Sequence, residues 1–199
     1  MRTGAPDPFP ILALVCSVLC ACAPGGKGEG NDTVTDKSED YPIAGLSARD
    51  LRWALDRLGP KNEEGERHDA ITRWRFEYTY GFDESRGGCA VGDLDLNAQI
   101  TTILPRWTPE PGAPSDLVTR WAAYVDCARL HESGHRRIYL DSLPQFRRRA
   151  RGLGARPTCD ELSTALDALA HALLEEVKGL QVAYETRTDH GYAQCGHFQ

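Results

Sequence analysis

Residues 71–80 read ITRWRFEYTY, and aromatic side chains alternate with polar ones over most of this segment. A period of two residues is typical of a β-strand that buries one face and exposes the other. Aromatic residues interleaved with arginines also occur on nucleic-acid-binding surfaces. However, the formal net charge of this 199-residue chain is −6, and nucleic-acid-binding domains normally carry a clustered basic excess. We therefore expect the aromatic face to form a core, and we expect no nucleic-acid partner.

A second strand is predicted after the turn-rich residues 81–88. Its apolar residues change parity at Gly92-Asp93, from Cys89 and Val91 on one side to Leu94 and the alternate positions up to Ile100 on the other. An extra residue at a β-bulge re-aims side chains in this way. The two strands predict an antiparallel sheet built from a hairpin.

Three segments with helical spacing flank the two strands. The first spans residues 47–58 and opens with a capping box. The second begins at Ser115, and we expect Pro144 to break or restart it, because proline cannot donate the helical hydrogen bond. The third spans residues 159–188. The sequence thus predicts an α+β domain in which a small antiparallel sheet packs on two long helices.

Residues 131–135 read HESGH, an H-E-x-x-H motif inside the second predicted helix. Histidines four residues apart lie on one helix face, one turn apart, so both imidazoles can reach a single zinc ion. The glutamate between them does not bind the metal. It takes a proton from the metal-bound water, and the resulting hydroxide attacks a carbonyl that the metal polarises. The motif predicts His131 and His135 as metal ligands and Glu132 as the general base.

The spacing of residues along the sequence does not decide which side chain is the third metal ligand. Glu176 borders the apolar stripe of the last helix, so helical spacing alone favours it, whereas Glu185 and His190 lie where that helix ends. A carboxylate or an imidazole from any of these positions would complete a site of three protein ligands and one water, as in catalytic zinc proteins.

The N-terminus has the layout of a bacterial export signal. The apolar run at residues 11–21 follows a basic residue and is too short to span a bilayer as a mature helix. Residues 19–22, Leu-Cys-Ala-Cys, resemble a lipobox in which Cys22 is lipidated, and the three acyl chains of such an anchor attach stably to a membrane. An ordinary signal-peptidase cut would place Pro24 beside the cut, which is unfavourable. We therefore expect a signal peptide with a lipobox over residues 1–21 and a flexible polar tether over residues 22–45.

Four cysteines remain in the predicted domain, residues 46–199. An even number of cysteines in an exported protein predicts two disulfides, for which three connectivities are possible. The four residues are Cys89, Cys127, Cys159 and Cys195.

A spaced set of short motifs lies on both sides of the HESGH segment. They are Gly87-Gly88-Cys89, Leu104-Pro105 with Trp107, Trp121, Cys159, and Tyr184-Glu185 leading to Thr188-x-His190-Gly191. Together with the HESGH segment they resemble the bacterial family named domain of unknown function 922, which is grouped with zinc-dependent peptidases of the zincin type. The resemblance runs from about Leu46 to Gly191.

This resemblance implies a zincin-like active-site helix, zinc as the cofactor and Glu185 as the third ligand. The family usually carries aspartate where this chain has Glu185, and its pattern has no acid that matches Glu176. His190 is then the second choice, either as a ligand or as a catalytic donor to a developing oxyanion.

The resemblance also implies a bond between Cys89 and Cys159, which leaves Cys127 and Cys195 for each other. The positions of the second pair agree with this. Cys127 lies one helical turn before His131, and Cys195 follows the segment that contains Glu185.

These features predict a zinc-dependent peptidase that hydrolyses peptide bonds of a peptide or protein substrate through a metal-bound water. We expect it to be exported and held in the bacterial envelope, on the periplasmic or cell-surface side, by a lipid anchor alone. The alternative is a non-enzymatic envelope lipoprotein with a structural or vestigial metal site. A water in the fourth coordination position would indicate the enzyme, and a fourth protein ligand would indicate the structural site.

Overall fold

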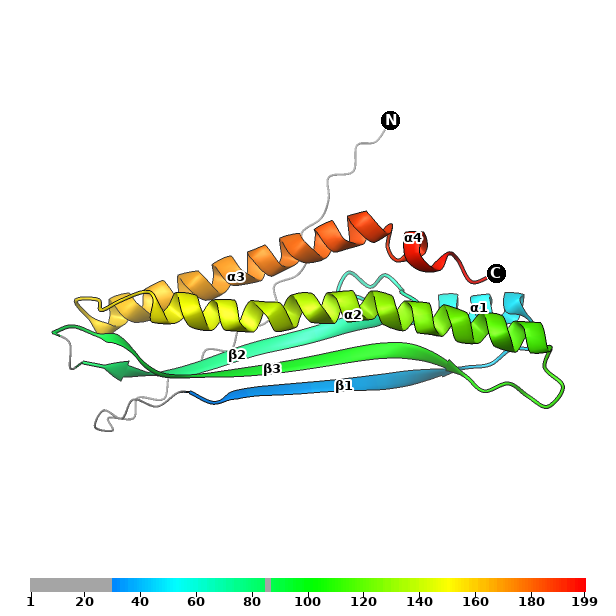
Figure 1. Ribbon diagram of the computed structural model, residues 1–199, viewed down its shortest axis with the longest axis horizontal. Coiled ribbons are helices and arrows are strands. Elements are labelled where there is room, and N and C mark those ends of the chain that lie inside the picture. The colour runs from blue at the N-terminus through cyan, green and yellow to red at the C-terminus, as the bar shows by residue number, and fades with distance from the viewer. Residues whose placement is uncertain (1–29, 85–86) are drawn as a thin grey trace, which may run out of the picture.

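The computed structural model describes residues 30–84 and 87–199. A three-stranded sheet forms one layer of an elongated molecule, and two long helices lie together on one face of it (Figure 1). The predicted α+β class is confirmed. The strands are β1 (Asp32–Ile43), β2 (Ile71–Asp83) and β3 (Ala90–Trp107), and the helices are α1 (Ala48–Leu58), α2 (Ser115–Arg151), α3 (Cys159–Thr188) and α4 (Tyr192–Cys195).

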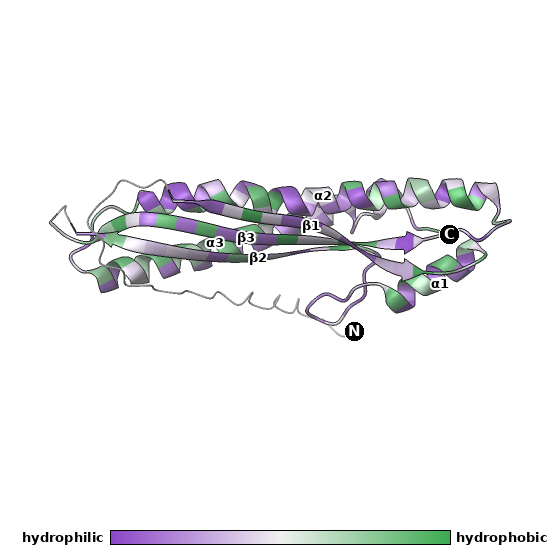
Figure 2. Cartoon of the chain, turned by 90° about the horizontal axis from the view of Figure 1, so that it is seen from below, coloured by the Kyte–Doolittle hydropathy of each residue, from purple (hydrophilic) through white to green (hydrophobic). Residues whose placement is uncertain are grey.

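β2 and β3 form the predicted antiparallel hairpin. Tyr80 pairs with Leu94 and Phe82 pairs with Val91, so Gly92 and Asp93 of β3 face the single residue Gly81 of β2. This is the bulge expected from the change in parity. Hydrophobic and hydrophilic residues alternate along both strands, as the view from the open face of the sheet shows (Figure 2).

The main core lies between this hairpin and the two long helices. The aromatic face of β2 packs against α2, where Phe146 meets Phe76 edge-on with ring centroids 5.1 Å apart. Leu162 and Leu166 of α3 complete the same cluster and are fully buried. A second cluster joins α1, the end of β3 and the start of α2, and Phe198 near the C-terminus packs into it.

β1 corrects two expectations. Residues 32–43 were expected to lie in a flexible tether, but they pair with β3 in parallel along their whole length, so the sheet is mixed and not purely antiparallel. The side chains of β1 are nearly all exposed, which explains why hydrophobic periodicity gave no signal. Besides the backbone pairing, β1 is held by ion pairs with α2: Asp32 with Arg147 and Asp36 with Arg136.

The three predicted helices follow their expected boundaries with one exception, and the short helix α4 was not predicted. At the start of α1, the Ser47 hydroxyl accepts from the backbone N–H of Asp50 and donates to its carboxylate. α2, however, continues through Pro144 to Arg151, so the predicted break is wrong. Proline removes one hydrogen bond from a helix, and the burial of Leu143 and Phe146 on either side holds both halves of α2 against the same core.

Two disulfides cross-link the fold, in the two pairs expected above. Cys89 and Cys159, with Cα atoms 5.0 Å apart, join the start of β3 to the start of α3. Cys127 and Cys195, with Cα atoms 5.4 Å apart, join α2 to α4. Each bond closes a long loop and therefore restricts the unfolded chain.

The predicted signal peptide, the lipobox and Cys22 lie outside the described residues. Within residues 30–84 and 87–199, no helix is long and apolar enough to cross a membrane.

Replacing Phe146 with alanine tests the main core. We expect Phe146→Ala to lower the free energy of unfolding by about 3–5 kcal/mol, because it leaves a cavity among fully buried rings. The control is Leu130→Ala on the same helix, where the side chain is 62% exposed and the change should stay within about 0.5 kcal/mol. Urea unfolding of the full-length protein measures both values, and similar losses in the two variants would contradict this core.

Candidate metal centre

Helices α2 and α3 bring three potential ligand atoms together. The Nε2 atoms of His131 and His135 on α2 are 3.2 Å apart. Oε1 of Glu185, in the last turn of α3, lies 2.9 Å from Nε2 of His135 and 3.8 Å from Nε2 of His131. In the part of the chain that the structure describes, these three side chains form the group of His, Cys, Asp and Glu residues that could hold a metal ion.

Two glutamines orient the imidazole rings. Nδ1 of His131 donates to Oε1 of Gln194, at 2.9 Å, and Nδ1 of His135 donates to Oε1 of Gln181. The orientation of the Gln181 amide follows from its nitrogen, which donates to the backbone carbonyl of His135. Because an amide oxygen can only accept, Nδ1 of His135 carries the proton and its Nε2 lone pair points toward the shared centre. The bond to Oε1 of Gln194 favours the same tautomer for His131.

This donor set fits zinc. Two nitrogens at 2.0–2.1 Å from a tetrahedral zinc ion are about 3.3 Å apart, close to the 3.2 Å between the Nε2 atoms. Two lone pairs that face each other at this distance repel, and a cation between them would remove the repulsion. Two imidazoles with one carboxylate also match the His₂Glu ligand set of catalytic zinc sites.

Glu132 is buried next to this cluster, with an exposed fraction of 4%. Its Oε2 accepts a hydrogen bond from the hydroxyl of Thr72 at the start of β2, at 2.8 Å. Burial raises the pKa of Glu132, although His135 and the Thr72 hydrogen bond oppose the rise. The carboxylate is therefore held in place from the sheet, while its own helix carries the two histidines.

The three cluster residues shift one another's pKa. Burial lowers the pKa of His131 and of His135, but Glu185, the glutamine partners and the charge of Glu132 together outweigh burial, so that the pKa of each histidine is raised. Burial raises the pKa of Glu185, yet the two histidines lower it further, and the net direction is down. Glu185 is therefore ionised, and the cluster presents the negative charge that a bound cation needs.

Tyr184 determines how closely α3 approaches α2. Its hydroxyl donates to the backbone carbonyl of His131, at 2.9 Å, and its ring stacks on the imidazole of His131. The ring lies over Gly134, the fourth residue of HESGH, where an added Cβ would stand 2.2 Å from the Cζ of Tyr184. Glycine at this position therefore permits the contact that places the adjacent Glu185 next to the histidines.

The chain after α3 folds back over His131. Asp189, His190 and Gly191 all have positive φ angles, which end the helix and reverse the chain. Gly191 then packs against the His131 ring, and α4 carries Gln194 to Nδ1 of the same ring. The neighbouring disulfide between Cys127 and Cys195 anchors this segment to α2.

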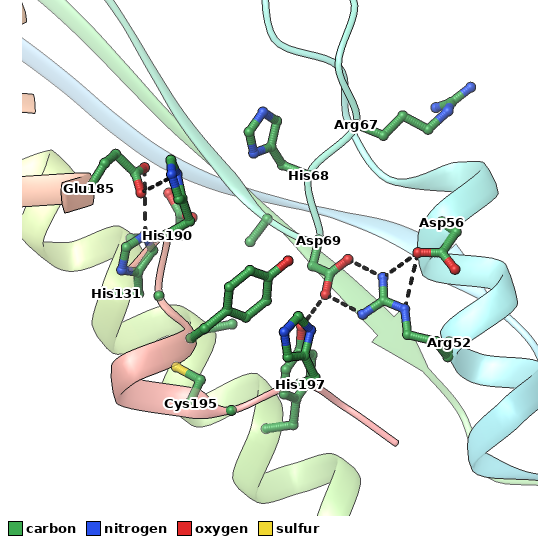
Figure 3. Close-up of a pocket in the computed structure, with 17 residues that line it drawn as sticks. Arg52, Asp56, Arg67, His68, Asp69, His131, Glu185, His190, Cys195 and His197 are labelled. Atoms are coloured by element: carbon green, nitrogen blue, oxygen red, sulfur yellow. Dashed lines mark hydrogen bonds and ion pairs between the residues drawn. The ribbon is translucent and has the colours of Figure 1, made fainter. Parts of the chain in front are cut away.

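A cavity of about 570 Å³, here called the polar cavity, opens beside the cluster (Figure 3). Its wall includes His131, Glu132, Glu185 and His190. On the far side, the carboxylate of Asp69 accepts hydrogen bonds from the guanidinium of Arg52 and from the hydroxyl of Tyr124. These bonds join α1, α2 and the segment that leads into β2 and Thr72.

The structure separates the three candidates for the third ligand. Glu185 lies in the cluster. Glu176, which helical spacing favoured, is exposed and forms an ion pair with Arg149, with a nitrogen–oxygen distance of 2.6 Å, so this expectation is wrong. The side chain of His190 is 68% exposed and its Nδ1 lies 3.3 Å from Oε2 of Glu185. His190 thus contacts Glu185 and lines the cavity without joining the three-residue cluster.

Sequence reasoning missed the residues that support the cluster. Gln181 lies one turn before Glu185 on the same face of α3, which is a signal that spacing could have supplied. Thr72 and Gln194 come from segments that only the tertiary fold brings to α2, and no local pattern marks them.

The fold and the cluster define an α+β protein with a candidate His₂-carboxylate metal centre on an H-E-x-x-H helix. The family described as "Bacterial protein of unknown function (DUF922)" matches residues 38–191, and the chain belongs to this family. The match begins inside β1 and ends at Gly191, so it includes all three cluster residues. No curated protein and no solved structure matches the chain.

Gly134→Ala tests the contact between α2 and α3. The added methyl group would collide with Tyr184, so we expect the free energy of unfolding to fall by about 1–3 kcal/mol and the binding of added zinc to weaken. The matched control is Gly179→Ala on α3, where an added Cβ meets nothing within 4 Å, and this change should stabilise the protein by about 0.5–1 kcal/mol. Chemical denaturation and zinc titration measure the two effects. Equal stability in the two variants would contradict the proposed role of Gly134.

Proposed function

We propose that the protein is a zinc-dependent peptidase held in the bacterial envelope by a lipid anchor. The observation that carries this proposal is the position of Glu132. A buried carboxylate stands on the wall of an open cavity, beside three side chains whose ligand atoms all lie within 4.8 Å of one another. Hydrolysis by a general base needs this arrangement, because the base must reach the attacking water while substrate enters from the cavity.

The residues would share the work as follows. His131, His135 and Glu185 would hold the zinc ion, and Gln194 and Gln181 would keep the two rings oriented. A zinc ion in this position polarises a carbonyl group and lowers the pKa of water.

Glu132 would accept the proton of the attacking water and return it to the leaving amine. The Thr72 hydroxyl would hold the Glu132 carboxylate in one orientation through the reaction. His190, at the cavity wall beside Glu185, would donate a hydrogen bond to the oxygen that becomes negatively charged as the carbonyl is attacked.

The open cavity favours an enzyme over a closed structural site. A structural zinc site has four protein ligands, and the imidazole of His190 lies beside Glu185. The side chain of His190 is largely exposed and remains outside the ligand group among the described residues. Three protein ligands beside a cavity leave one position for water, as catalytic sites do.

Glu132→Gln is the direct test of this function. The amide keeps the size of the side chain but cannot accept a proton, so we expect peptide hydrolysis to fall by about 100-fold or more while zinc stays bound. The control is Glu176→Gln, which should retain both zinc and activity because Glu176 pairs with Arg149 at the surface. A peptide-library cleavage assay and metal analysis supply the measurements. Full activity in the Glu132 variant would refute the assigned role.

The lipid anchor is tested at Cys22. We expect the mature protein to begin at Cys22 and to carry acyl chains on it, and we expect Cys22→Ala to remove the protein from the membrane fraction. Mass spectrometry of the N-terminal peptide and cell fractionation measure this. Cys20→Ala is the matched control and should leave the anchor intact. An unmodified N-terminus at any other residue would contradict the lipobox.

A further inference from the structure

A second cavity, of about 520 Å³ and here called the apolar cavity, lies between β2 and the middle of α3. Its lining includes the side chains of Ile71, Trp74, Tyr139, Leu174 and Val177. The rings of Trp74 and Tyr139 stack with their centroids 4.7 Å apart. The volume lies within the range of pockets that hold small ligands.

The apolar cavity adjoins the metal centre through two residues with known partners. Thr72 lines it, and the hydroxyl of Thr72 bonds the carboxylate of Glu132. Gln181 also lines it, and the amide of Gln181 bonds both Nδ1 and the carbonyl of His135. The cavity is thus one side chain away from the general base and from one metal ligand.

The two cavities follow one another along α2, α3 and the start of β2, on either side of the centre. On α2, Glu132 is the last residue that lines the polar cavity, and Tyr139, further along the helix, lines the apolar cavity. On α3, Gln181 is the last residue that lines the apolar cavity, and Glu185, one turn further along, lines the polar cavity. The chain around the start of β2 forms a third wall of both cavities. Residues 67–70 line the polar cavity, and residues 71–74 line the apolar cavity.

We propose that the apolar cavity is the substrate subsite that receives a bulky aromatic side chain next to the scissile bond. This rests on the peptidase function proposed above. An extended peptide that crosses the metal centre would pass from the polar cavity into the apolar one. The polar part of the peptide would then face Arg52, Asp69 and His131. Its aromatic side chain would enter the apolar cavity beside Trp74 and Tyr139.

The residues that line the apolar cavity explain why an aromatic side chain is the proposed occupant. A large ring buries more apolar area than any other side chain and gains further from packing against other rings. Three carboxylates and two cations are among the residues that line the apolar cavity, which leaves one negative charge in excess and disfavours an acidic side chain. These groups are Glu63, Glu64, Glu175, Arg73 and Lys178.

The test combines cleavage with binding, both on the full-length protein loaded with zinc. Fluorogenic peptides that differ at one residue beside the cut, with Phe, Leu, Ala, Lys or Asp, report specificity. We expect kcat/KM for Phe to exceed that for Ala by about tenfold or more. In Leu174→Glu this preference should be lost and cleavage beside Lys should rise. The matched control is Leu180→Glu on the same helix, where the side chain is exposed and lines neither cavity.

Binding is measured separately in Glu132→Gln, so that it does not depend on turnover. N-acetylphenylalanine amide should shift the indole N–H resonance of Trp74, assigned with Trp74→Phe, and N-acetylalanine amide should not. Leu174→Glu in the same background should abolish the shift.

The outcomes separate the two proposals. Cleavage without a preference for Phe, or a preference that Leu174→Glu leaves intact, overturns the subsite and leaves the peptidase standing. Binding of the Phe amide at Trp74 with no cleavage of any peptide overturns the peptidase and supports the apolar binding site. Absence of both the shift and the preference overturns the subsite.

Discussion

The contact between Tyr184 of α3 and Gly134 of α2 is the constraint on which the candidate metal centre depends. The tyrosine ring occupies the space that any larger residue would fill, and its hydroxyl bonds the carbonyl of His131. Because Glu185 follows Tyr184 directly, this contact sets the height and rotation of α3 that bring a carboxylate to the two imidazoles. The two spacer positions in HESGH are therefore unequal: Ser133 is exposed, whereas Gly134 determines the packing of the helices.

The rest of the centre is built from segments that are distant in sequence. The sheet supplies Thr72, which holds the Glu132 carboxylate, α3 supplies Gln181, and the C-terminal segment supplies Gln194. The disulfide between Cys127 and Cys195 fixes that last segment to α2. This covalent bond therefore helps to hold Gln194 in the position where it orients the His131 ring. Side chains held in this way would already be organised when a metal or a substrate arrives, which would reduce the entropy lost on binding.

Local patterns predicted those parts whose determinants lie within a few residues of each other. The alternation in residues 71–80 predicted β2, the change of parity at Gly92 predicted the bulge, and HESGH predicted two histidines on one helix face. Glu176 shows where this reasoning fails: it borders the apolar stripe of its helix, but Arg149 on the neighbouring helix pairs with it at the surface. Helical spacing gives a direction around one helix and does not give that helix's position against another.

The sequence by itself therefore determined the α+β class, the hairpin, the boundaries of α1, α2 and α3 other than the break expected at Pro144, and the two histidine positions, because each depends on hydrogen bonding and side-chain periodicity within one segment. The tertiary structure alone decided that residues 32–43 form a strand, because β1 buries almost no side chain and is held by pairing with β3 and by ion pairs with α2. It also decided that α2 continues through Pro144, and it brought Thr72 and Gln194 to the centre. These features depend on surfaces that meet only after the chain has folded, and no periodicity within a single segment records them.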